Sequence, residues 1–139
     1  MKPGSRHLAL AATAAASTAA AAAGVWVLRR FDPSAAGSPL PGCLFYQFTG
    51  LYCPGCGMTR ALHALVHGDL AQMMAMNPLL PLLIIAVPLL ALQGFGYRLP
   101  LPKAVVATLI SAKFWIGLLL GFWLLRNLPW WPFAWLAPG

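Results

Sequence analysis

Three long apolar segments constrain this chain more than any other feature. They cover residues 8–28, 77–93 and 105–125. Because a helix rises about 1.5 Å per residue, a segment of about 20 residues crosses a hydrocarbon layer of about 30 Å. Hydrophobic residues make up 60% of the chain and charged residues 8%, whereas about 25% of an average soluble domain is charged. We therefore predict an all-α integral membrane protein with about three transmembrane helices.

The first segment is rich in alanine and has basic residues at both ends. Lys2 and Arg6 precede it, and Arg29 and Arg30 follow it. A basic start followed by small residues would also suit a secretory signal peptide that is removed. The abrupt stop of the apolar run after Leu28, at two arginines, is more typical of a membrane anchor. We predict a transmembrane helix here, with a signal peptide as the alternative.

The second and third segments carry signals of their own. Asn77 suits the N-cap of a helix and Pro78 its first position, where no backbone donor is lost. Pro81 and Pro88 are expected to bend this helix. Lys113 lies inside the third segment, and a lysine at the centre of a membrane costs about 2.5–3.5 kcal/mol. We therefore expect Lys113 to face other protein or the membrane surface.

The few charged residues flank the apolar segments. Nine Lys and Arg stand against two acidic residues, and basic residues beside apolar runs are typical of topology signals and of contacts with anionic headgroups, not of a nucleic-acid surface. The expected partners are the lipid bilayer and a membrane protein, without nucleic acid. With three spans the positive-inside rule gives a tie. The side of the N-terminus has Lys2, Arg6, Arg98 and Lys103, and the other side has Arg29, Arg30, Arg60 and Arg126.

The chain divides into three parts. Residues 1–30 contain the first span. Residues 31–76 form a loop that begins with a linker rich in Pro, Gly, Ser and Ala and contains all three cysteines. Residues 77–139 contain two spans and a tail rich in Trp and Pro, which is typical of a membrane interface.

Two short interfacial helices are predicted in the cysteine-containing loop. Thr59 suits the N-cap of a helix over residues 60–67, and Gly68 suits its left-handed end. Asp69, with Gln72 three residues later, resembles a capping box for a second helix through residue 76.

The chemistry of the chain is concentrated around Cys53-Pro54-Gly55-Cys56. Two thiols three positions apart, joined by a Pro-Gly turn, can converge on one metal ion or close a small disulfide. At 100° per residue, the side chains of Arg60, His63 and His67 share one helix face within about 40°. Three interpretations of this cluster compete.

The first interpretation is a metal site. Cys43, Cys53 and Cys56 would supply three thiolates to a tetrahedral zinc ion, and His63 or His67 would be the fourth ligand. A zinc ribbon has two such cysteine turns, whereas this chain has one turn and a separate cysteine.

The second interpretation is thiol–disulfide chemistry, and the third is packing. In the second, Cys53 and Cys56 cycle between dithiol and disulfide, Cys43 is a resolving thiol, and Arg60 beside a helix N-terminus favours the thiolate. In the third, the cysteines pack as small apolar residues, Arg60 binds phosphates, and the histidines lie at the headgroup boundary.

Several short motifs resemble those of a bacterial family of small membrane proteins that is described only as a domain of unknown function. The resemblance implies a multi-pass protein of the bacterial inner membrane and implies no reaction or substrate. Leu44 follows Cys43 where the family pattern has Pro. The motifs are residues 49–61, His67-Gly68-Asp69, Asn77-Pro78, Arg126-Asn127-Leu128-Pro129 and Pro132-Phe133.

The predicted function follows from these observations. We expect a non-enzymatic protein of the cell membrane whose cysteine loop organises a metal site or a disulfide and presents a docking surface for a partner. The alternative is a membrane thiol–disulfide oxidoreductase that uses Cys53 and Cys56.

Overall fold

The computed structural model of the chain describes residues 3–35, 37–40, 42–97 and 100–138. These residues form helices and contain no strand, as predicted. The elements are α1 (Pro3–Arg30), α2 (Leu44–Thr49), α3 (Met58–Val66), α4 (Leu70–Met76), α5 (Leu79–Gly94), α6 (Lys103–Leu109), α7 (Ala112–Arg126) and the 3₁₀ helix η1 (Phe133–Leu136).

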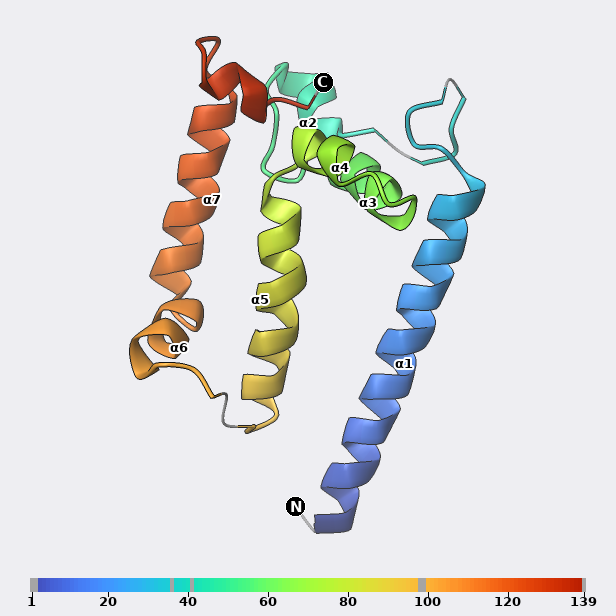
Figure 1. Cartoon of the computed structure of the whole chain (residues 1–139), viewed down its shortest axis with the longest axis vertical. Coiled ribbons are helices and arrows are strands. Elements are labelled where there is room, and N and C mark those ends of the chain that lie inside the picture. Colours follow the sequence, from blue (N-terminus) through green and yellow to red (C-terminus); the bar gives the residue numbers. More distant parts are fainter. Residues whose placement is uncertain (1–2, 36, 41, 98–99, 139) are drawn as a thin grey trace.

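The short helices gather at one end of the long ones. Figure 1 shows α1, α5 and α7 extending along the long axis of the molecule, with α2, α3 and α4 at the end where α1 and α7 finish and α5 begins. The C-terminal segment returns to the same end, and α6 lies at the opposite one. We call residues 42–78 together with residues 126–138 the cysteine layer.

The long helices are compatible with a membrane protein. In α1, the stretch Ala11–Arg30 is long and apolar enough to cross a membrane, and none of its residues is buried. The pairs α4 with α5 and α6 with α7 also qualify if each is one span, although they are bent by 94° and 63°. The described residues therefore contain one clear span, and up to three if the bent pairs count.

The third apolar segment is broken, where the sequence predicts one continuous span. Helix α6 ends at Leu109 and α7 begins at Ala112, because Ser111 has an extended backbone with φ −77° and ψ 115°. The indole of Trp115 donates to the Leu109 carbonyl at 2.7 Å and satisfies an acceptor that the break leaves free. As a consequence, Lys113 is exposed in the first turn of α7 instead of lying in the middle of a long helix.

The start of α5 is close to the predicted one. The helix begins at Leu79 with Pro78 as its N-cap residue, one position later than expected. The Asn77 side chain still supplies the expected acceptor, since its Oδ1 takes the Leu79 N–H at 3.0 Å. Pro88 lies inside α5.

Two of the three local signals in the loop are confirmed, one of them in part. Gly68 has the left-handed φ of +80°, and Asp69 Oδ1 accepts the Gln72 N–H at 2.8 Å at the start of α4. The Asp69 N–H donates to the Ala64 carbonyl at 2.9 Å, so the second half of the predicted capping box does not form. The N-cap predicted at Thr59 is wrong. Helix α3 begins one residue before Thr59, with Gly57 as its N-cap residue at φ +78°, so Thr59 lies within the first turn. Helix α2 was not predicted.

A small core joins α3, α4 and α5. Ala61 and Ala64 of α3 are buried against Met73 of α4 and Leu80 of α5, with other methionines and leucines packed around them. Small side chains on α3 allow the two short helices to approach closely. Met73 is thus a packing residue of α4.

Candidate metal centre

Three cysteine sulfurs meet within the cysteine layer. Cys43 is the N-cap residue of α2, and Cys53 and Cys56 flank the turn before α3. The Cys53 Sγ lies 3.3 Å from the Cys43 Sγ and 3.2 Å from the Cys56 Sγ, and all three sulfurs lie within 4.8 Å of one another. These separations are much longer than a disulfide bond of about 2.05 Å, so the three cysteines are free thiols.

The Pro-Gly turn brings Cys56 back onto Cys53. The Cys56 N–H donates to the Cys53 carbonyl at 3.1 Å, and the Met58 N–H donates to the Gly55 carbonyl at 3.0 Å. The Cys53 N–H in turn donates to the Cys56 Sγ at 3.1 Å. An amide aimed at sulfur stabilises a thiolate, which is the form that binds metal.

Gly57 allows the turn to pack against α4. A Cβ at this position would lie 2.5 Å from the Met76 carbonyl oxygen and 3.0 Å from Pro138 Cβ. The left-handed φ of +78° further favours glycine here. The cysteine turn therefore contacts both the α4 end and the C-terminal tail.

The three thiols have unequal acidity. Burial, and then hydrogen bonds to the Cys43 and Cys53 thiols, raise the pKa of Cys56 to about 12. A hydrogen bond with Cys56 is the main cause that lowers the pKa of Cys43 to about 7. A bound metal ion deprotonates coordinating thiols, so metal binding would bring all three sulfurs to the same charge state.

Arg126 holds the cysteine turn from the end of α7. Its side chain is 1% exposed and donates to the carbonyls of Cys53 at 3.0 Å, Pro54 at 3.1 Å and Cys56 at 3.2 Å. Its guanidinium carbon lies 4.8 Å from the Phe122 ring centroid. Three backbone acceptors of one turn thus share a single buried cation.

No side-chain carboxylate of the residues that the structure describes is bonded to this buried cation. The whole chain contains two acidic residues, Asp32 and Asp69. Asp32 Oδ1 accepts the Ser34 N–H at 2.7 Å, and Asp69 caps α4. A buried charge is costly unless an opposite charge lies nearby, so an anionic group in the cysteine cluster would stabilise Arg126.

Two asparagines complete the polar contacts of the turn. Asn77 is 0% exposed, and its Nδ2 donates to the carbonyls of Pro54 at 3.0 Å and Cys56 at 3.2 Å. Asn127 exchanges two hydrogen bonds of 2.8 Å with the backbone of Tyr52. Sequence reasoning missed the role of Arg126, Asn77 and Asn127 at this site. Their presence among the residues that carry the family resemblance was the available signal.

The two histidines lie outside the sulfur cluster. The His63 Nδ1 is 2.7 Å from the Leu28 carbonyl of α1, and the His67 Nδ1 is 2.8 Å from the His63 carbonyl. Their rings are in contact, with centroids 4.3 Å apart. Neither belongs to the group of ligand atoms that lie within 4.8 Å of one another in the described residues. A fourth ligand from His63 or His67 stays a prediction.

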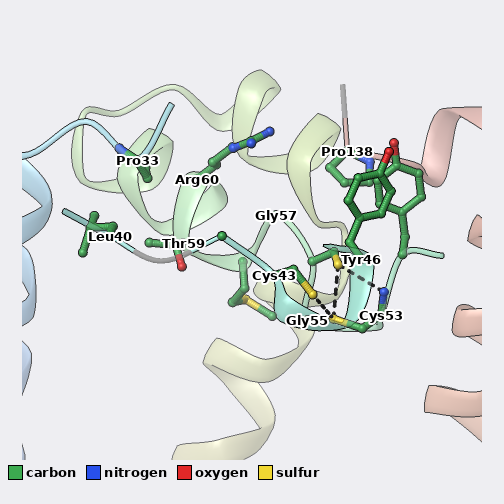
Figure 2. Close-up of a pocket in the computed structure, with 14 residues that line it drawn as sticks. Pro33, Leu40, Cys43, Tyr46, Cys53, Gly55, Gly57, Thr59, Arg60 and Pro138 are labelled. Carbon is green, nitrogen blue, oxygen red and sulfur yellow. Dashed lines mark hydrogen bonds between the residues drawn. The ribbon is translucent and has the colours of Figure 1, made fainter. Parts of the chain in front are cut away.

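A cavity of about 530 Å³ adjoins the three cysteines. Figure 2 shows Cys43 and Cys53 near its middle, with Tyr46 and Pro138 to one side and Thr59, Arg60, Leu40 and Pro33 to the other. Thr59 and Arg60 are exposed on the first turn of α3. Arg60, which was predicted beside the cysteines, and Thr59 therefore line the same cavity as the sulfurs, whereas Asp69 does not line it.

These observations define the class of protein. The described residues are helical, and a buried arginine binds the backbone of a turn at which three thiols cluster. Residues 43–91 match a family model described as "Protein of unknown function (DUF2752)". The predicted resemblance to a domain of unknown function is thereby confirmed, and the bacterial origin stays a prediction. The matched range contains the three cysteines and Asn77. No curated protein and no solved structure matches the chain.

Proposed function

We propose that Cys43, Cys53 and Cys56 bind one metal ion at the boundary of a membrane, with zinc as the ion. The observation that carries this proposal is the meeting of three free sulfurs within 4.8 Å, 3.2 and 3.3 Å apart for two of the pairs. Tetrahedral zinc with Zn–S distances of about 2.3 Å has its sulfurs about 3.8 Å apart. The two separations from the Cys53 Sγ would have to lengthen by about 0.5–0.6 Å to reach this value.

The charge of Arg126 supports the metal-bound state. Three thiolates and one divalent cation together carry one negative charge, which matches the single positive charge of the guanidinium. With three neutral thiols, the buried guanidinium would have carbonyl partners and no counter-charge. The metal-bound thiolates are therefore favoured over the neutral thiols, because their negative charge removes the cost of burying an unpaired guanidinium.

The exposed apolar residues support a multi-pass membrane protein with the cysteine layer at the boundary. Ile85, Val87, Ile116, Leu120 and Leu124 are exposed on α5 and α7. Lipid chains would cover such side chains. The exposed Trp130, Trp131 and Trp135 follow α7 and suit the headgroup region. Docking of a membrane protein partner on this layer stays a prediction.

Bound metal would have a structural role in this arrangement. It would join the start of α2 to the turn before α3 and so link segments that are otherwise held by hydrogen bonds. We therefore propose a non-enzymatic organising centre for the cysteine layer.

Metal analysis of the reduced, purified protein tests the proposal. We expect about one zinc per chain, and each of Cys43→Ser, Cys53→Ser and Cys56→Ser should lose most of it, because three ligands act together. His63→Ala and His67→Ala test the predicted histidine ligand, and with the three cysteines as the only protein ligands both variants should retain the metal. Protein that contains no metal after zinc loading, with all three cysteines open to alkylation, would contradict the proposal.

A thiol–disulfide oxidoreductase is the second candidate, and the position of Cys53 favours it. Its sulfur lies 3.3 and 3.2 Å from the two other sulfurs, so it can pair with either. Formation of one disulfide would release two electrons and two protons to a disulfide of a partner protein, which is reduced to two thiols. A reversible mass difference of two hydrogen atoms, confined to these cysteines, would support this candidate.

The orientation of the chain also bears on the second candidate. Arg126 is buried, and Lys113 lies in the first turn of α7, at the end opposite to the cysteine layer. The sequence alone gave four basic residues on each side of the membrane. Adding Lys113 gives five on the side of the N-terminus, and leaving out the buried Arg126 gives three on the side of the cysteine layer. By the positive-inside rule the cysteine layer then faces away from the cytoplasm, where disulfides persist. Labelling of the cysteines with a membrane-impermeant maleimide measures this orientation.

A further inference from the structure

We infer that the fourth ligand of the metal comes from outside the chain, as the thiolate of a small molecule that enters the cavity beside Cys43, Cys53 and Cys56. This inference rests on the proposed metal site and deepens it. The ligand is a small-molecule thiolate, and the fourth coordination position of the metal is the one at which it exchanges.

The number of donors in the chain is the first argument. Among the described residues, three sulfurs form the group of close ligand atoms, and no histidine or carboxylate joins them. Structural zinc sites are closed by four protein ligands, whereas sites with three protein ligands keep a position for an exchangeable ligand. The three-cysteine cluster therefore leaves one coordination position of the metal for an exchangeable ligand.

The cavity provides the second argument. It adjoins the sulfurs, and its volume of about 530 Å³ lies within the range of about 300–1,000 Å³ that is usual for small-molecule sites. Tyr46, Tyr52, Leu40 and Pro138 give it apolar walls, and Thr59 and Arg60 supply polar groups. A small organic molecule fits this lining better than a bare anion does.

The charges provide the third argument. A divalent ion with four thiolates carries two negative charges. Arg126 donates to carbonyls of the cysteine turn and Arg60 lines the cavity, so two positively charged side chains border the site. Among the described residues, no carboxylate lines the cavity to oppose an anion. A soft metal held by three thiolates prefers a fourth soft donor, which favours a thiolate over a phosphate or a carboxylate.

Cobalt(II) makes this inference measurable. The full-length protein, purified in detergent with a phosphine reductant, is loaded with Co²⁺, whose sulfur-to-metal charge-transfer absorption increases with the number of bound thiolates. Titration with mercaptoacetate should raise this absorption to saturation, and inorganic phosphate should leave it unchanged. The cobalt content after dialysis should stay at one ion per chain.

Two variants test the role of Arg60. Arg60→Gln should raise the half-saturating concentration of mercaptoacetate roughly two- to fivefold, the effect expected of an exposed charge pair. Arg30→Gln is the matched control, because Arg30 ends α1 and does not line the cavity. It should leave the titration unchanged.

The outcomes separate the two proposals. Failure to bind Co²⁺ overturns the metal site and this inference together. Stoichiometric Co²⁺ binding with an absorption that mercaptoacetate does not change overturns this inference and leaves the metal site in place. A response to phosphate equal to that of mercaptoacetate shows an anion site at Arg60 and also overturns the thiolate inference.

Discussion

The cysteine layer and the long helices are held in place by different forces. In the cysteine layer, Arg126 and Asn127 bind backbone groups that are 70 to 75 positions away in the sequence. In α1, by contrast, none of the residues of the apolar stretch is buried, and large apolar side chains of α5 and α7 are exposed. The layer is defined by bonds within the chain, whereas the helices depend on what surrounds them.

This difference follows from the chemistry of the backbone. A turn such as Cys53–Cys56 leaves carbonyls without partners, and in apolar surroundings each free polar group is costly. Arg126 and Asn77 satisfy those carbonyls from two other elements. A helix satisfies its own backbone, so α1, α5 and α7 need no such contacts with one another.

The largest effect is expected from Arg126→Met. The substitution removes three donors to the cysteine turn and its buried positive charge, so we expect a loss on the order of 3–5 kcal/mol and a loss of bound metal. Thermal unfolding in detergent and metal analysis measure both. Lys113→Met removes an exposed charge from the same helix and serves as the control. If Arg126→Met and Lys113→Met have the same unfolding temperature and the same metal content, the cysteine layer does not depend on Arg126.

A smaller effect is expected from Gly57→Ala, which tests how closely the turn packs. An alanine at a left-handed position costs about 1–2 kcal/mol, and the contact with the Met76 carbonyl should add about 1–3 kcal/mol of overpacking. Gly68→Ala is the matched control, because its φ is +80° and nothing lies within 4 Å of its Cβ position. If Gly57→Ala and Gly68→Ala unfold at the same temperature, the turn does not pack closely against α4.

The smallest effect is expected from His63→Ala. It removes the hydrogen bond to the Leu28 carbonyl, so α1 should be held less firmly on α3 by about 0.5–1.5 kcal/mol. Metal content should not change, since His63 lies outside the sulfur cluster. Proteolysis at the linker after α1 and metal analysis measure the two effects. Loss of metal in this variant would establish His63 as the fourth ligand.

Local signals in the sequence were sufficient for much of the fold. The left-handed Gly68, the Asp69 cap and the start of α5 near Asn77 each depend on neighbours within a few residues. The close approach of Cys53 and Cys56 has the same local origin. Thr59 was assigned as a cap because its side chain suits that role, but the glycine before Met58 starts the helix earlier.

The contacts that complete the site were beyond local reasoning. The bond between Arg126 and the cysteine turn joins the end of one apolar segment to a loop more than 70 residues earlier. Arg126 at the end of an apolar segment has the pattern of a topology signal, and only packing shows that it is buried. The break before α7 likewise depends on Trp115 and the Leu109 carbonyl, a contact that hydrophobicity does not reveal.

X-ray absorption at the zinc edge, measured on the reduced and zinc-loaded protein, tests the central claim most directly. Three thiolates from Cys43, Cys53 and Cys56 predict three sulfur neighbours at about 2.3 Å and one lighter neighbour without imidazole scattering. Addition of mercaptoacetate should raise the number of sulfur neighbours to four. Fewer than three sulfur neighbours in wild-type protein, or a spectrum that Cys43→Ser leaves unchanged, would contradict the three-cysteine metal site.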